Sequence, residues 1–136
     1  MCKAPDDKVS FHYTFKVAKS DIDTLNHVNN LVYLKWVLEA ANKHWNSLAS
    51  DEIKNENLWV VLRHEIDYLK QAFLNDNITV HTWIGDTEGV RSVRHVHICC
   101  GESLLVQCKT TWCLVDHKTL RPKRIGADIL DLFIKK

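Results

Sequence analysis

The pattern of apolar and polar residues predicts one strand, one long helix and then four more strands. Residues 9–17 alternate in polarity and are rich in β-branched and aromatic residues, which is typical of a strand. Four later segments, separated by short polar turns, have the same character and cover residues 58–68, 78–87, 90–100 and 103–115. Long strands joined by short turns favour an antiparallel meander.

Residues 31–48 instead follow the helical period, and Asn29 or Asn30 can cap the start of this helix. The stripe that we expect to face the interior consists of Leu31, Leu34, Leu38, Ala41 and Trp45. At about 1.5 Å per residue the helix is about 27 Å long, so a sheet should wrap around it. Residues 50–57 are expected to be a polar connection, and residues 126–136 a short closing helix.

These elements predict the α+β class, with one long central helix wrapped by a curved antiparallel sheet of about five strands. The length of 136 residues fits one domain, and we expect residues 1–136 to form it without a linker or an internal repeat. Such a sheet cannot cover its own edges, which favours a homodimer that joins two sheets, or a tetramer.

Composition narrows the partners and the location. The formal net charge of +1 argues against nucleic acid as the main partner, because phosphate binding usually requires a clear basic excess. Five cysteines without metal-site spacing indicate free thiols in a reducing compartment. There is no apolar N-terminal stretch and no run of about 18 apolar residues, so we expect a cytoplasmic protein without a membrane span.

The loop at residues 20–30 carries the candidate chemistry. It holds two carboxylates, one imidazole and three amides, and it runs directly into the start of the long helix. Helix starts offer unpaired N–H groups and a partial positive charge that can hold an oxyanion, while a nearby carboxylate can attack a carbonyl or activate water. This combination suits hydrolysis of an activated acyl group such as a thioester. Ordinary capping and turn formation is the other reading of these residues.

Histidines and basic residues offer weaker signals. His95 and His97 share one face of a strand, and His81 or His12 could join them, but no carboxylate has ligand spacing and we expect no metal. Basic residues give the C-terminal half a positive tilt: Arg91, Arg94, Lys109, Arg121, Lys123 and Arg124. A solvated surface is the ordinary explanation, and a patch for the phosphates of CoA or for an acidic carrier protein is the functional one.

The segment from Ser20 to Ala41 resembles the signature of hotdog-fold acyl thioesterases. It is similar to the acyl-ACP thioesterase pattern SDxDxNxHVNNxxYxxWxLE and to the looser DxDxxGHVNNxxY pattern of the 4-hydroxybenzoyl-CoA thioesterase family. The matching positions are Ser20, Asp21, Asp23, His27, Val28, Asn29, Asn30, Tyr33, Trp36, Leu38 and Glu39. The resemblance extends over about residues 9–126 and implies a hotdog fold, with the acyl-CoA or acyl carrier protein thioester as substrate and no other cofactor.

The resemblance also implies roles for individual residues. Asp23 corresponds to the catalytic carboxylate, as nucleophile or general base, and His27 to the histidine that meets the thioester or its oxyanion. The positions implied to bind substrate or position the oxyanion are Asn29, Asn30, Tyr33 and Glu39.

The chain departs from the acyl-ACP pattern at Leu25, where an Asn is expected, and at Gln71 and Ala72, where a Glu-Cys pair is expected. These departures favour acyl-CoA over the carrier protein. The acyl-ACP enzymes are double-hotdog chains, so a single hotdog would have to dimerise to complete the site. The alternative function is a non-catalytic acyl-CoA-binding module, and a hotdog dehydratase or hydratase ranks third because its motif is absent.

Overall fold

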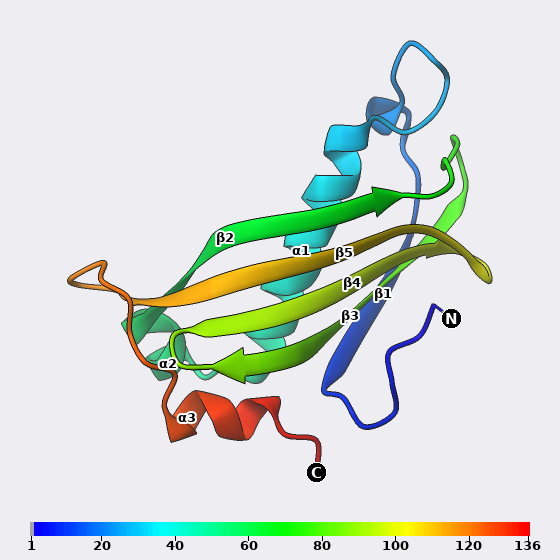
Figure 1. Cartoon of the computed structure of the whole chain (residues 1–136). Helices are drawn as coiled ribbons and strands as arrows, with labels where there is room; N and C mark the ends of the chain where they lie inside the picture. The colour runs from blue at the N-terminus through cyan, green and yellow to red at the C-terminus, as the bar shows by residue number, and fades with distance from the viewer. Residues whose placement is uncertain (1) are drawn as a thin grey trace.

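The computed structural model describes residues 2–136, and in it five antiparallel strands form one curved sheet (Figure 1). The sheet has the order β1-β3-β4-β5-β2. The strands are β1 (Ser10–Lys16), β2 (Asn57–Tyr68), β3 (Asn77–Glu88), β4 (Arg91–Cys100) and β5 (Ser103–Asp116). The predicted strands and the α+β class are therefore confirmed. The predicted four-strand meander holds only for β3, β4 and β5; it was wrong for β2, which pairs with β5 at the far edge of the sheet, so that β1 and β2 are the two edges.

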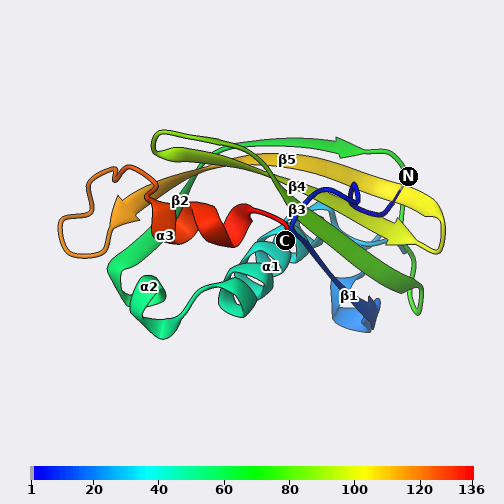
Figure 2. The same ribbon diagram turned by 90° about the horizontal axis from the view of Figure 1, so that it is seen from below.

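The long helix α1 (Asn30–Leu48) lies against one face of the sheet, which arches over it (Figure 2). Asn29 is the capping residue, and its side-chain oxygen accepts a hydrogen bond of 2.9 Å from the N–H of Leu31. An Asn cap of this kind satisfies one of the N–H groups that a helix start leaves unpaired. The cap fixes where the preceding loop enters the helix.

The buried face of α1 differs from the predicted stripe. Its buried side chains are Tyr33, Trp36, Val37, Ala40, Ala41 and His44. Leu31 is 74% exposed, and Leu34, Leu38 and Trp45 are only partly buried. The stripe prediction was therefore wrong by a rotation of about one residue, because two apolar stripes lie side by side on this helix and the sheet covers the one that carries the aromatic rings.

Two groups of buried residues fill the space between α1 and the sheet. The larger one surrounds the first half of α1 and includes Trp36, with Val80, Val96 and Ile98 from β3 and β4. The smaller one lies at the C-terminal end of α1, where Leu114 of β5 meets the closing segment. Each fully buried aliphatic side chain contributes about 1.5–3 kcal/mol, so these clusters fix the position of the helix on the sheet.

The connection after α1 is not a plain loop as predicted. Residues Asp51–Glu56 form a short helix, α2, because the Ser50 side chain caps its start and Ile53 packs into the smaller cluster. The predicted closing helix is present as α3 (Ala127–Leu130), followed by one 3₁₀ turn at Asp131–Phe133. Within residues 2–136, no helix combines the length and the apolar character that crossing a membrane requires.

The prediction that all five cysteines are free thiols is wrong for two of them. Cys2 and Cys99 form a disulfide that ties the N-terminal segment to β4. Cys2 and Cys99 are 97 residues apart, and their spacing in the sequence does not predict that they pair. Cys100, Cys108 and Cys113 are free, and the last two are buried, as expected for small apolar side chains.

Candidate functional site

The loop between the 3₁₀ turn Lys19–Asp21 and α1 folds back on itself. An isolated antiparallel bridge pairs Ile22 with Val28, and the N–H of Asp23 donates to the carbonyl of His27 at 3.0 Å. Asn26 closes the turn with a φ of 64°, a left-handed conformation that Asn adopts more readily than most residues. The turn thereby brings the two ends of the predicted catalytic segment, Asp23 and His27, side by side.

Asp23 and His27 are close together and both remain accessible. Oδ2 of Asp23 lies 3.8 Å from Nδ1 of His27, and the two side chains are 25% and 18% exposed respectively. The other carboxylate oxygen, Oδ1, accepts a 2.8 Å hydrogen bond from the N–H of Leu25. Nδ1 of His27 lies 3.3 Å from the carbonyl of Val28, so in the neutral ring this nitrogen carries the proton and Nε2 is left to meet water or substrate.

Tyr33 and Ala72 hold the loop in place. The N–H of Val28 donates to the carbonyl of Ala72 at 2.9 Å, and the N–H of Ala72 donates to the Tyr33 hydroxyl oxygen at 2.8 Å. Tyr33 is only 2% exposed, and burial raises the pKa of its hydroxyl. The resemblance implied that Tyr33 binds substrate. In the structure its buried hydroxyl instead links α1 to the segment after β2, which in turn anchors the loop.

The other predicted site residues lie at or beyond the start of the helix. The N–H of Asn29 donates to the carbonyl of Asp21, and the carbonyl of Asn30 accepts from the Tyr68 hydroxyl at 3.5 Å. Glu39 lies nine residues further along α1, about 13 Å from Asn30, and 3.9 Å from the ammonium group of Lys35. The structure therefore gathers Asp23, His27, Asn29 and Asn30, and leaves Glu39 apart from them.

The electrostatics at this end of α1 favour negative charge. The aligned peptide dipoles place about half a positive charge at the start of the helix, into which the loop that carries Asp23 leads. A tetrahedral oxyanion formed here would be stabilised by the same field and by N–H donors near the helix start. The arrangement can thus activate water on one side of a carbonyl and hold its oxygen on the other.

Large apolar side chains are exposed around the loop. Leu25 on the loop, Leu31 at the start of α1, and Leu69 and Phe73 on the segment after β2 are all exposed. A monomeric protein rarely leaves a contiguous surface of this kind uncovered, because each side chain gains from leaving water. This rim can receive an acyl chain or a second subunit. This rim was not predicted from the sequence, because Leu31 was placed on the stripe expected to face the interior.

The curved sheet wrapped around one long helix is the hotdog fold, and comparison with known proteins agrees. The family profile of the acyl-ACP thioesterase N-terminal domain matches residues 8–133. The chain therefore belongs to the acyl-ACP thioesterase family. A comparison with curated protein sequences found no match.

Solved structures of similar fold include the probable thioesterase YbaW from Escherichia coli, with a TM-score of 0.77, 23% identity, and coverage of 91% of this chain and 98% of that one. The Staphylococcus aureus protein SAV2348, solved in complex with CoA, has a TM-score of 0.82 at 18% identity, with coverages of 96% and 85%. The 12:0-ACP thioesterase from Umbellularia californica has a TM-score of 0.79 at 21% identity. This alignment covers 93% of the present chain and 51% of the plant enzyme, so the chain spans about half of it.

Proposed function

We propose that this chain hydrolyses acyl thioesters, with Asp23 and His27 as its catalytic residues. The observation that carries the proposal is the Asp23–His27 pair at 3.8 Å, accessible and located beside the start of α1. Membership in the acyl-ACP thioesterase family supports the same chemistry. No metal or redox group is required for it, because a thiolate leaves without strong acid assistance.

In the proposed mechanism, the carboxylate of Asp23 either draws a proton from water or attacks the carbonyl carbon itself. A tetrahedral oxyanion forms, and His27 and the N–H donors at the start of α1 stabilise it. The intermediate collapses by breaking the carbon–sulfur bond. When water is the nucleophile, the products are directly the free acid and the thiol, whose sulfur takes the remaining proton. When Asp23 attacks, the acyl group is left as an anhydride on Asp23, and a water molecule then hydrolyses it to the free acid, restores the carboxylate and supplies the proton for the thiolate. Asn29 holds the geometry by capping Leu31.

The thiol part of the substrate is CoA or the phosphopantetheine of a carrier protein. The family is that of acyl-ACP thioesterases, whereas the solved structure of SAV2348 contains CoA. Ala72, which stands where the acyl-ACP pattern has Cys, is fully buried and uses both its N–H and its carbonyl to anchor the loop, so it presents no reactive side chain to substrate. Gln71, which stands where the pattern has Glu, carries no acidic group. These departures, with Leu25, support acyl-CoA as the first substrate to test.

We further propose a homodimer joined through β2. This edge strand is twelve residues long and exposes Leu58, Val60, Val61 and Leu62. Exposed apolar edges are liable to aggregate unless they are paired or covered. If two copies of β2 pair antiparallel about a twofold axis, Asn57 of one chain lies near Tyr68 of the other. The Tyr68 end is next to the candidate loop, so the partner would complete the surroundings of the site.

The cytoplasm remains the location that we propose. Cys100, Cys108 and Cys113 are free, as is usual in a reducing compartment, and this supports it. The disulfide between Cys2 and Cys99 argues instead for an oxidising compartment. The redox state of these two cysteines in cells therefore tests the proposed location.

Thiol release followed with a chromogenic reagent tests the proposed function. Short, medium and long acyl-CoA are compared with the corresponding acyl carrier protein thioesters. We expect turnover on at least one series, and the preferred chain length reports the depth of the acyl pocket. Absence of turnover on both series, together with tight binding of acyl-CoA, would contradict the proposal and indicate the non-catalytic binding module.

A further inference from the structure

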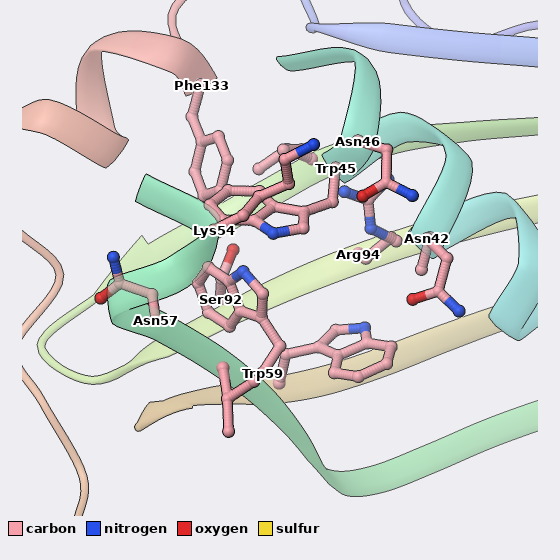
Figure 3. Close-up of a pocket in the computed structure, with 13 residues that line it drawn as sticks. Asn42, Trp45, Asn46, Lys54, Asn57, Trp59, Ser92, Arg94 and Phe133 are labelled. Carbon is pink, nitrogen blue, oxygen red and sulfur yellow. The ribbon is translucent and has the colours of Figure 1, made fainter. Parts of the chain in front are cut away.

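A cavity lies at the opposite end of α1 from the candidate loop. Its volume is about 270 Å³, it is partly open to solvent, and it is lined by the last turns of α1, by α2, by the start of β2 and by residues of β4 and β5 (Figure 3). Four aromatic rings form most of its apolar wall: Trp45, Trp59, Trp112 and Phe133. Trp45 and Trp59 meet edge to face with ring centroids 5.6 Å apart. The cavity is thus built for a flat apolar group.

The charged residues on this cavity wall are all positive. Arg94 and Lys54 line it, and no Asp or Glu occurs among its lining residues within the described part of the chain. The Lys54 ammonium group lies 3.4 Å from Asp51, a fully exposed carboxylate outside the lining. Lys54 therefore has a carboxylate close by, whereas the charge of Arg94 has to be stabilised within the cavity.

Arg94 is a buried cation whose protein partners are neutral. Its side chain is 7% exposed, and its Nη1 donates to Nδ1 of His44 at 2.8 Å and to Oγ1 of Thr82 at 2.9 Å. Burial, and secondarily the charge of Arg94, lowers the pKa of His44 to about 3, so the imidazole is neutral at physiological pH. Burial lowers the pKa of Arg94 to about 10, and it stays charged. Across residues 2–136 no carboxylate forms an ion pair with it.

A second donor on the same wall has no protein partner. Nε1 of Trp112 is buried and forms no hydrogen bond with the described residues. The strand register pairs Trp112 with Ser92 and Arg94 with Thr110. Trp112 and Arg94 are therefore diagonal neighbours on adjacent strands, a relation in which the two Cα atoms are about 7–8 Å apart. A buried unpaired donor and a buried uncompensated cation are both costly, and one bound anion can relieve both. The carbonyl oxygen of the Asn57 side chain is also unpaired there and can accept from a bound water.

We propose that this cavity binds a small aromatic carboxylate, with its ring among the tryptophans and its carboxylate at Arg94 and Trp112. Guanidinium and carboxylate form the strongest of the common hydrogen-bonded pairs. A cavity of 270 Å³ lies just under the usual range for drug-sized ligands of about 300–1,000 Å³, so a single ring is the size that fits.

Within one chain this cavity is separate from the candidate loop. Its lining residues on α1, Ala41 to Asn46, follow Asn30 by 11–16 residues, or about 17–24 Å along the helix. In the dimer joined through β2, however, Asn57 to Trp59 would face the loop of the partner. Binding of the carboxylate at this cavity does not depend on the proposed thioesterase function.

Isothermal titration of the full chain with phenylacetate and with phenylacetamide tests the proposal, because the two probes share a shape and differ in charge. We expect phenylacetate to bind about tenfold or more tightly than the amide, the size expected of a hydrogen bond to a charged group. Arg94→Met should abolish this preference and leave amide binding in place. Arg91→Met, a change of an exposed arginine on the same strand, should behave as the wild type.

Trp112→Phe keeps an aromatic ring and removes the N–H, and it should reduce the preference several-fold. If circular dichroism shows that Arg94→Met is unfolded, Trp112→Phe is the variant that tests the proposal. Equal affinity for the two probes, no binding of either to the folded protein, or an undiminished preference in Trp112→Phe would overturn the proposal. Asp23→Asn should bind phenylacetate normally, so a failure of the proposed thioesterase activity and a failure of this site give different results.

Discussion

Replacing Asp23 with asparagine is expected to lower kcat for thioester hydrolysis by about 10²–10⁴-fold, the usual contribution of a positioned acid or base. The asparagine oxygen can still accept the N–H of Leu25, so the turn should stay folded. What is lost is the carboxylate charge 3.8 Å from the His27 ring, and with it the ability to take a proton or attack a carbonyl. Thiol release under saturating substrate measures the effect, and KM should change little.

Asp21→Asn is the matched control for this prediction. Asp21 lies two residues earlier, and its carboxylate accepts the N–H of Ala18 at 2.9 Å, a bond that an amide oxygen can replace. This variant should keep most of the activity. If Asp23→Asn retained full activity, or if Asp21→Asn lost as much as Asp23→Asn, the assignment of Asp23 would be wrong.

Introducing lysine at both Val60 and Leu62 is expected to separate the proposed dimer and to lower activity on the order of 100-fold. Both side chains are exposed on the edge strand β2, and charged residues at such edges prevent strand pairing. The activity should fall because the partner chain would no longer shield and complete the site, and a small loss of positioning is costly. Light scattering after size exclusion should change from twice 15.8 kDa to 15.8 kDa.

Ile134→Lys provides the comparison, since Ile134 is also an exposed apolar residue but lies at the C-terminus. It should leave both mass and activity unchanged. A wild-type protein that is monomeric and active would contradict the proposed dimer. A double-lysine variant that stays dimeric would show that the subunits meet at another surface.

The strands and α1 could be predicted from the sequence because their periodicity is strong and their turns are short. The buried face of α1 could not, because Leu31 and Leu34 form a second apolar stripe and only the packed sheet decides between the two. The α2 helix was missed because six residues, fewer than two helical turns, are too few for a periodic pattern to be recognised. The disulfide was missed because sequence spacing does not reveal which cysteines meet in space.

The candidate site shows the same division. The loop with Asp23 and His27 was evident from its residue types, but the anchoring of this loop by the backbone of Ala72 leaves no trace in the side-chain sequence. Arg94 was grouped with the exposed basic residues, and the structure corrects this, because Arg94 is buried. The signal was available: Arg94 has the same parity along β4 as the buried Val96 and Ile98, and a charge in that register points inward.

Hydrolysis of acyl-CoA in ¹⁸O-labelled water tests the central claim most directly, because it follows the acyl group and the thiol together. The wild-type protein is incubated with an excess of acyl-CoA, and the products are measured by mass spectrometry. We predict many free acids per protein, each carrying oxygen from the solvent, and one free thiol for each acid. Acyl-CoA that stays intact while it binds stoichiometrically, with acyl carrier protein thioesters equally untouched, would contradict the account.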